Sequence, residues 1–262
     1  MFSDKEFYLV NREERHFGFM LISSIVYDKE FREYFFNLIN HRLYTADFVN
    51  PEVGVPKILN NEDYDIYSEV ALFRDYWNDL GDHNKYTQEL HFKRKCIIEI
   101  FLECFGLDKS LVDKYSMFWT GKVGESKLWF PGKWSIGSIN LLQSEEAIKN
   151  REILRIRWAC NAKPDLLILS KNSGILIELK VESGIGEGDL GYNQEETQID
   201  IMNLAKATIP IFKNIEFKRL MLEKKRNSVL SIEGLKNKLT WDEIMPKFNN
   251  ELVKKHMLNM PK

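Results

Sequence analysis

Cysteine is scarce in this 262-residue chain, and the three that occur (Cys96, Cys104 and Cys160) cannot all pair with one another. No CxxC motif is present, and the five histidines are scattered without an HExxH or similar short ligand pair. These absences exclude a scaffold held by several disulfides and count against a structural zinc site. Reduced thiols are typical of the cytosol, so we expect a cytoplasmic protein.

Long apolar runs are also missing. The longest, from Phe17 to Tyr27, is interrupted by Gly18, Ser23 and Ser24, and it is too short to cross a bilayer. The first residues mix acids and bases before any apolar stretch, which is not the pattern of a signal peptide. The sequence therefore predicts no membrane partner.

An excess of positive charge is lacking as well, since 37 Lys and Arg residues stand against 39 Asp and Glu residues, for a formal net charge of −2. A protein that holds nucleic acid only by its phosphates is usually basic, so the composition counts against a bulk electrostatic binder. It does not exclude a nuclease, because catalytic carboxylates lower the net charge and a local basic patch is enough to dock a nucleic-acid backbone.

The N-terminal part of the chain has apolar residues at helical spacing. Steps of three and four residues predict helices over 11–40, 66–80 and 88–106. Ser68 is the expected cap of the second helix, and Gly106 is expected to close the third. The first part of the fold is therefore predicted to be helical.

Residues 115–143 have another character, because they are rich in glycine, aromatic residues and lysine, which predicts short strands and loops. Trp119, Trp129, Phe130 and Trp134 could form a surface on which nucleobases stack while neighbouring lysines meet phosphates. The alternative is a β-rich subdomain that packs its aromatic side chains inward.

The second half of the chain alternates strands and helices. A short helix is expected over 144–151, and the alternation of Arg155 and Arg157 with apolar neighbours predicts a strand over 151–161. The remaining expected elements are a β-hairpin over 162–182, a helix over 192–208, a strand over 215–225 and a terminal helix over 239–257. This order predicts an α/β or α+β fold around a central mixed sheet.

The hairpin carries the charged residues on which a functional hypothesis depends. If its strands pair directly across the turn, the numbers of paired residues sum to about 345. Asp165 then lies opposite Lys180, with Glu178 one pleat away. Because Glu178 and Lys180 are two residues apart, they project from the same face of their strand. Three charged side chains are thus expected to converge at one end of an otherwise apolar hairpin.

Such a convergence is costly unless the charges compensate one another or bind something. Neighbouring carboxylates persist in ionised form when a divalent cation bridges them. Asp165 and Glu178 are hard oxygen donors, and the carbonyl of Leu179 is expected to point the same way, so these residues predict a site for Mg²⁺ or Mn²⁺. Lys180 would orient or deprotonate the attacking water, or stabilise negative charge that develops on phosphorus.

The pair Pro164–Asp165, followed by Glu178–Leu179–Lys180, resembles the motif of the PD-(D/E)XK nuclease superfamily, which includes restriction enzymes and DNA-repair nucleases. The resemblance covers residues 153–215 most firmly, and it extends to the first helix. It implies a restriction-endonuclease-like core of helix, three strands, helix and strand around a central mixed sheet. The alternative for the motif is structural, with Asp165 capping a turn and Glu178 and Lys180 forming an ion pair at a strand end.

The resemblance also implies how the chain is organised. We expect residues 1–262 to form a single nuclease-like domain. Its core would comprise about residues 1–40 and 150–262, and an insertion of helices and strands would occupy about residues 41–149.

In this superfamily the first helix often supplies a further acid, and the helix after the third strand often carries a glutamine. The chain offers Glu14 as that acid, with Glu13 beside it, although first-turn acids are also favoured by the helix macrodipole alone. Because the insertion is long, other acids remain candidates: Glu69, Glu99 and Glu103. The glutamine would be Gln198, with Gln194 as the second choice.

The function implied is that of a metal-dependent nuclease of defence, restriction or repair, which hydrolyses phosphodiester bonds in DNA. Two alternatives stay open. One is a nuclease-like fold without activity that serves as a nucleic-acid-binding or assembly module, and the other is an RNA nuclease. Cleavage of both strands of a duplex would suggest a homodimer whose two-fold axis matches that of the substrate.

Overall fold

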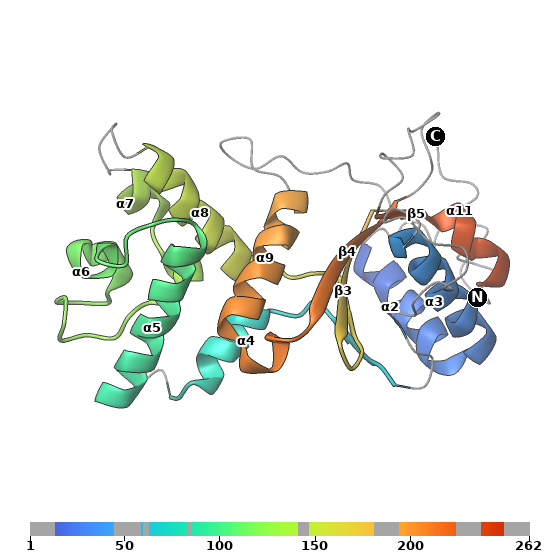
Figure 1. Ribbon diagram of the computed structural model, residues 1–262, viewed down its shortest axis with the longest axis horizontal. Helices are drawn as coiled ribbons and strands as arrows, with labels where there is room; N and C mark the ends of the chain where they lie inside the picture. The colour runs from blue at the N-terminus through green and yellow to red at the C-terminus, as the bar shows by residue number, and fades with distance from the viewer. Residues whose placement is uncertain are drawn as a thin grey trace. The chain divides into compact units, whose positions relative to one another are not determined.

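Five strands follow one another in sequence order across one mixed, open sheet (Figure 1). They are β1 (Asp65–Ser68), β2 (Leu166–Leu169), β3 (Ser173–Leu179), β4 (Glu216–Glu223) and β5 (Lys238–Thr240). Strands β1, β2 and β3 are antiparallel neighbours, whereas β4 lies parallel to β3 and β5 lies parallel to β4. The expected α/β class with a mixed sheet is confirmed.

The structure is a computed structural model that describes residues 14–44, 59, 63–82, 85–140, 147–180, 194–223 and 237–248. Its α-helices are α2 (Glu14–Tyr27), α3 (Lys29–Tyr44), α4 (Leu72–Asp79), α5 (Gln88–Cys104), α6 (Leu111–Lys114), α7 (Ile136–Asn140), α8 (Ala147–Asn161), α9 (Gln194–Thr208) and α11 (Trp241–Ile244). Short 3₁₀ turns are η1 (Ser116–Phe118), η2 (Pro131–Lys133), η5 (Pro210–Phe212) and η6 (Met245–Lys247). Among these described helices, none combines the length and the apolar character needed to cross a membrane.

The chain divides into two compact units. Unit 1 comprises Met1–Val70, Pro164–Gly184 and Glu216–Lys262, and it contains the sheet with α2, α3 and α11. Unit 2 comprises Ala71–Lys163 and Ile185–Ile215, and it contains α4 to α9.

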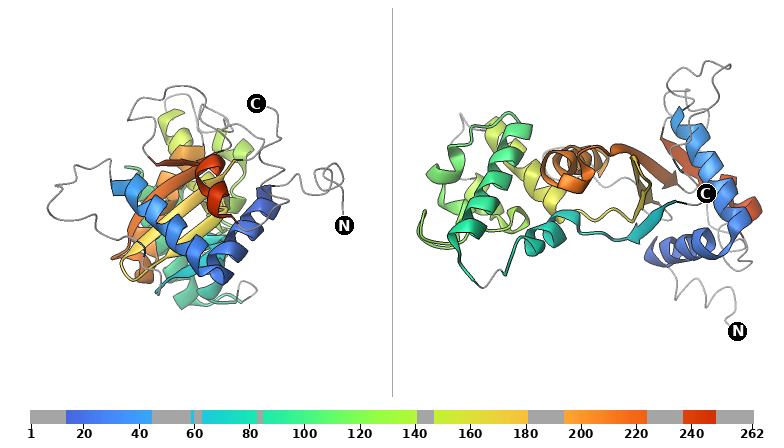
Figure 2. Two further views of the ribbon diagram at one scale, coloured as in Figure 1. Left: turned by 90° about the vertical axis from the view of Figure 1, so that its right-hand side faces the viewer. Right: turned by 60° about the horizontal axis from the view of Figure 1, so that its bottom comes forward.

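In unit 1, α2 and α3 cover one face of the sheet and cross its strands in the left view of Figure 2. Side chains alternate along a strand, so residues opposite each other in register share a face. The pairs Leu166–Ile177 and Leu179–Leu222 both point toward these helices. The two helices bury their side of this core with Phe17, Leu21, Ile25, Phe31, Phe35, Phe36 and Ile39, and Trp241 of α11 belongs to the same core.

The helix expected over 11–40 is divided at Asp28 into α2 and α3. The Asp28 carboxylate accepts the N–H of Phe31 at 3.0 Å, which caps the first turn of α3. Arg32 donates to the carbonyl of Ile25 at 2.9 Å near the end of α2. Because both helices bury their apolar faces in the same core, the periodicity continues across the break and did not reveal it.

The prediction of a helix over 66–80 with Ser68 as its cap is wrong in its first half. Residues Asp65–Ser68 form β1, which pairs with β2 at the edge of the sheet, and α4 begins only at Leu72. A strand of four residues gives too short a pattern to compete with the helical spacing that follows it. Its conformation comes from pairing with β2, which lies far away in the sequence.

The strand expected over 151–161 is also wrong, because these residues belong to the helix α8. Ile153, Ile156 and Cys160 are buried at steps of three and four residues. The alternation of Arg155 and Arg157 with apolar residues was therefore coincidental, and it matched a period of two over only a few positions.

Unit 2 confirms the helix predicted over 88–106. Helix α5 ends at Cys104, and Gly106 follows it with a φ of +68°. The N–H of Leu107 donates to the carbonyl of Leu102 at 2.9 Å, and the N–H of Gly106 donates to that of Glu103, also at 2.9 Å. This is a Schellman ending, which requires the left-handed conformation that glycine adopts readily.

The described part of the aromatic stretch, 115–140, forms 3₁₀ turns, loops and the helix α7 rather than the expected strands, with a single described bridge between Trp119 and Leu128. Phe118, Trp119 and Trp134 are buried. The interpretation that the aromatic side chains pack inward is therefore correct for these three. The segment in which a terminal helix was expected from residue 239 begins instead with β5, which the short helix α11 follows.

Arg94 of α5 has a buried guanidinium, and we expect its removal to stabilise the protein. The residue is 2% exposed and lies 5.2 Å over the ring of Trp77. Its Nε and Nη2 have no hydrogen-bond partner among the residues that the structure describes, and burial lowers the pKa of the group. Arg94→Met keeps the apolar stem and removes the unsatisfied donors, so it should raise the free energy of unfolding by about 1–3 kcal/mol.

The midpoint of urea unfolding measures this effect. The matched control is Arg74→Met, at an exposed position of α4, which should change the stability by less than about 0.5 kcal/mol. A fall in stability of Arg94→Met would mean that the contact between the guanidinium and Trp77 outweighs the unsatisfied donors.

Candidate active site

The hairpin of β2 and β3 brings the Asp165 segment beside the Glu178–Lys180 segment. Leu166 pairs with Ile177, so the register differs by two residues from the predicted one. Continued by one residue, it sets Asp165 opposite Glu178, with Lys180 one pleat further. The prediction that Asp165 lies opposite Lys180 is therefore wrong.

The difference comes from the turn. Ser170 and Ser173 exchange backbone hydrogen bonds of 2.8 and 3.4 Å, so Ser173 already belongs to β3. Ser173 and its neighbours Asn172 and Gly174 all favour turns, so the sequence pattern extended the turn too far toward β3. A shift of two residues, unlike a shift of one, leaves every side chain on the face where it was expected.

Asp165 is held through both its side chain and its main chain. Its Oδ2 accepts the N–H of Leu179 at 2.7 Å, and its carbonyl accepts the N–H of Glu69 at 3.1 Å. In an extended strand the N–H and the carbonyl of one residue point to the same side. The carbonyl of Leu179 therefore points to the Asp165 side of β3.

Glu178 and Lys180 form an ion pair, with Nζ at 2.9 Å from Oε1. Their side chains are 12% and 8% exposed, so the pair is largely shielded from water. The N–H of Lys180 donates to the carbonyl of Leu222 at 2.8 Å, and its own carbonyl accepts the indole N–H of Trp241 at 3.2 Å. The lysine is thus fixed at its main chain by two elements and at its ammonium group by Glu178.

The three charged residues lie on the face of the sheet that points away from α2 and α3. Leu179 belongs to the core under these helices, so strand alternation directs Glu178 and Lys180 to the other face. Asp165 lies two residues before Leu167, so its side chain points to the same face as that of Leu167. The register sets it opposite Glu178, on the face that points away from the helices. Two carboxylates and one ammonium group therefore meet at one end of the sheet.

The segment after β4 supports this end of the sheet. Thr240 and Glu243 form a capping box at the start of α11, and Arg42 forms an ion pair with Glu243. The cap places Trp241 at the first position of the helix, where its indole reaches the carbonyl of Lys180. The Thr-x-x-Glu spacing was the available signal for this support, although it does not name the residue that the indole contacts.

The expected helix acid, Glu14, is the first residue of α2, and its side chain and all of Glu13 lie outside the described residues. One turn later α2 meets β3 at Gly18, where an added Cβ would come within 3.0 Å of the Leu179 side chain. The start of α2 is therefore adjacent to Leu179, on the helix-covered face of β3.

The other predicted residues fall in several places. Glu69 follows β1 in unit 1, beside Asp165. Glu99 and Glu103 lie on α5 in unit 2 and form ion pairs with lysines there. Gln198 lies on α9 in unit 2 and is 6% exposed, and the side chain of Gln194 lies outside the described residues.

The candidate side-chain ligands for a metal ion at this site are the carboxylates of Asp165 and Glu178. Within the described ranges, no group of three or more His, Cys, Asp or Glu side chains is arranged to hold a metal ion. Mg²⁺ is nevertheless often bound by one or two carboxylates, while waters and substrate phosphates complete its octahedron. Asp165 and Glu178 fit that requirement.

No protein-family model, curated protein or solved structure matches this chain. Function has to be argued from the chemistry of the site, because a fold class alone does not imply an activity.

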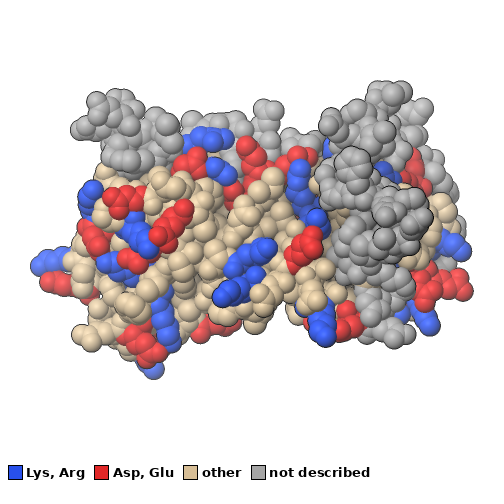
Figure 3. All heavy atoms as spheres, in the orientation of Figure 1, with Lys and Arg blue, Asp and Glu red and all other residues tan. Residues whose placement is uncertain are grey.

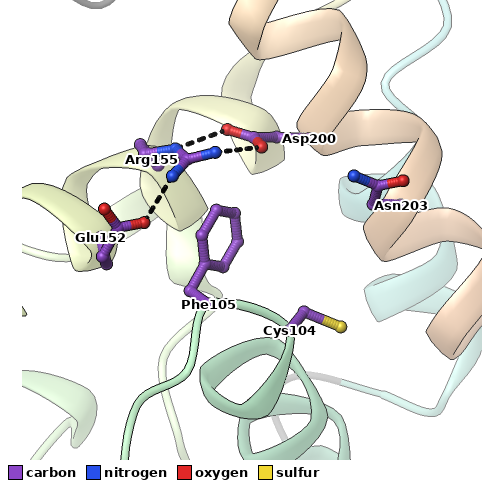
Figure 4. Close-up of a pocket in the computed structure, with 6 residues that line it drawn as sticks. All are labelled: Cys104, Phe105, Glu152, Arg155, Asp200 and Asn203. Atoms are coloured by element: carbon purple, nitrogen blue, oxygen red, sulfur yellow. Dashed lines mark hydrogen bonds and ion pairs between the residues drawn. The ribbon is translucent and has the colours of Figure 1, made fainter.

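Unit 2 contains a pocket of about 340 Å³ where the end of α5 meets α8 and α9 (Figure 4). Arg155 donates to both carboxylate oxygens of Asp200, at 3.1 and 2.8 Å, and to Glu152 at 2.6 Å. Its guanidinium lies 4.6 Å over the ring of Phe105. All three nitrogens of the guanidinium are engaged within the pocket wall, so Arg155 joins α8 to α9.

Desolvation, together with the nearby Glu103, raises the pKa of the Cys104 thiol in this pocket, which disfavours a nucleophilic role.

Proposed function

We propose that this protein is a metal-dependent nuclease that hydrolyses phosphodiester bonds in DNA. The observation that carries the proposal is the meeting of Asp165, Glu178 and Lys180 at one end of the β2–β3 hairpin, where Leu179 donates to Asp165 and Lys180 pairs with Glu178. Two acids and a lysine in this arrangement supply cation ligands and a positively charged group next to a scissile phosphate.

The order of the elements supports the same proposal. The helices α2 and α3 precede β1, the helices α4 to α8 separate β1 from β2, and α9 and β4 follow β3. If α4 to α8 are taken as an insertion, the remaining order agrees with the helix, three strands, helix and strand that the PD-(D/E)XK resemblance implies. In this proposal β1 takes the place of the strand that was expected over 151–161.

The residues have distinct roles in the proposed reaction. Asp165 and Glu178 would hold Mg²⁺ or Mn²⁺ with the carbonyl of Leu179. The bound cation would polarise a phosphoryl oxygen and lower the pKa of water. Lys180 contributes the positive charge of its ammonium group, and its main chain is held in place by two hydrogen bonds. It would therefore orient the attacking water or stabilise charge on the phosphate without a large rearrangement. The hydrogen bond from Leu179 keeps the Asp165 carboxylate directed toward the end of β3.

The surface charge bears on how the substrate is held. On the face drawn in Figure 3, acidic and basic side chains of the described residues are interspersed. The formal net charge is −2. Binding by a broad positive field is therefore not expected, and the affinity for DNA should depend on the cation and on local contacts.

Purified protein incubated with plasmid, linear duplex and single-stranded DNA, and with single-stranded RNA, tests the proposal. We expect cleavage of DNA with Mg²⁺ or Mn²⁺, none with EDTA, and a rate about a hundredfold lower for Lys180→Ala. The matched control is Lys171→Ala, an exposed lysine of the β2–β3 turn, which should cleave like the unmodified protein.

Cleavage that persists in EDTA, or that Lys180→Ala leaves unchanged, would contradict the proposal. Cleavage of RNA alone would indicate an RNA nuclease with the same site. If no nucleic acid is cleaved and calorimetry detects no Mn²⁺ binding, the fold serves as a binding or assembly module.

A further inference from the structure

Glu69 has an unusual backbone conformation for its residue type. Among the described residues, two that are not glycine have a positive φ, namely Glu69 at +47° and Asn237 at +65°. Asparagine tolerates the left-handed region, whereas a long side chain such as that of glutamate is disfavoured there. Strained backbone of this kind persists when surrounding contacts determine it, and it is frequent at functional sites.

The N–H of Glu69 points to Asp165, and the left-handed φ sets the direction of the chain directly after this N–H. Strand β1 ends in register with β2 at the pair Ser68–Leu166, and Glu69 and Asp165 come next on the two strands. The N–H of Glu69 donates to the carbonyl of Asp165 at 3.1 Å. Asp165 is therefore held by one hydrogen bond at its carbonyl and by another, from Leu179, at its carboxylate.

These two residues also stand where the chain passes between the units. Unit 1 stops at Val70 and resumes at Pro164. Glu69 and Asp165 are each one residue inside unit 1 at these two crossings. The hydrogen bond between them joins the outgoing and the returning chain at the edge of the site.

We infer that Glu69 is a positioning residue for Asp165, acting through its left-handed backbone rather than through its carboxylate. The left-handed conformation lets the chain leave β1 while the N–H of Glu69 stays bonded to the carbonyl of Asp165. This bond holds Asp165 where its carboxylate meets the N–H of Leu179 and lies beside Glu178. The inference rests on the proposed nuclease function for its catalytic consequence, but the placement of Asp165 can be measured separately.

Three substitutions of Glu69 distinguish an effect of its backbone conformation from an effect of its side chain. Glu69→Gly permits the left-handed conformation and removes the carboxylate, Glu69→Gln removes only the charge, and Glu69→Val disfavours the conformation because valine is β-branched. We expect the first two to keep kcat and Mn²⁺ affinity within about threefold of the unmodified protein. Glu69→Val should lower both by about tenfold or more, as loss of a residue that orients a metal ligand does, with KM for DNA little changed.

Calorimetry with Mn²⁺ alone and steady-state cleavage give these values, at a temperature where circular dichroism shows all variants folded. Equal losses in Glu69→Gly, Glu69→Gln and Glu69→Val would overturn the inference in favour of the carboxylate. An unaltered Glu69→Val would overturn it altogether.

Hydrogen exchange of the Leu179 amide tests the placement without catalysis, because this N–H is bonded to the Asp165 carboxylate. We expect the amide to be protected in the unmodified protein and in Glu69→Gly, and to exchange at least about tenfold faster in Glu69→Val. If the unmodified protein cleaves nothing but this pattern appears, the positioning role stands and the nuclease function fails. If the protein cleaves and the exchange rate is the same in all variants, the positioning role fails and the nuclease function stands.

Discussion

Replacing Asp165 by asparagine is expected to lower the rate of DNA cleavage by at least about a thousandfold while the protein stays folded. The Asp165 side chain accepts the N–H of Leu179 at 2.7 Å, and an asparagine oxygen can accept the same bond. What the substitution removes is charge. Glu178 is already paired with Lys180 at 2.9 Å, so without Asp165 the two remaining charges neutralise each other. Little attraction would then remain for a divalent cation.

Cleavage of plasmid DNA in Mn²⁺ and Mn²⁺ binding by calorimetry measure the two consequences, and both should fall together in Asp165→Asn. Asp65→Asn is the matched control, since Asp65 is an exposed residue of β1 in the same unit. It should leave cleavage and metal affinity unchanged. If Asp165→Asn cleaves at the original rate with the same need for metal, Asp165 is not a ligand, and the site proposed at the end of the hairpin is wrong.

The part of the site that could be predicted from the sequence lies in one hairpin. Strands β2 and β3 are apolar runs separated by turn-forming residues, and both the pairing and the face of each side chain follow from that pattern alone. The register was predicted with an error of two residues, which changed the partner of Asp165 but not its face. Because side chains alternate with a period of two, an even error of this kind preserves the convergence of Asp165, Glu178 and Lys180.

What could not be predicted depends on contacts between distant segments. Strand β1 has four residues and is defined by its pairing with β2, which lies about a hundred residues later in the chain. Glu69 was considered as a helix acid, but its conformation and its hydrogen bond to Asp165 follow from the position of that strand. Trp241 reaches Lys180 only because β5 lies beside β4. The expectation of a strand in place of α8 came from the alternation of Arg155 and Arg157 with apolar residues. Their partners Asp200 and Trp134 lie in other segments of unit 2, so the sequence pattern does not show them.

One of those arginines leads to the second large effect, which is on stability. Arg155→Met is expected to lower the free energy of unfolding by about 3–5 kcal/mol. Asp200, which accepts two hydrogen bonds from Arg155, is 1% exposed, so the substitution leaves a buried carboxylate without its guanidinium partner. Methionine keeps much of the apolar stem, so the loss would come mainly from the charged guanidinium, which pairs with Asp200 and lies over the ring of Phe105.

The matched control lies one turn earlier on α8. Arg151 is 41% exposed and its ion pairs with Glu152 and Glu196 are long, at 3.6 and 3.8 Å, so Arg151→Met should cost less than about 1 kcal/mol. Urea unfolding of both variants measures the difference. The double variant Arg155→Met, Asp200→Leu removes both charges and should recover much of the stability, because replacing a buried ion pair by apolar residues is often close to neutral. Equal stability of the two single variants would mean that Asp200 is solvated or paired well enough without Arg155, and that the contact between α8 and α9 does not depend on this arginine.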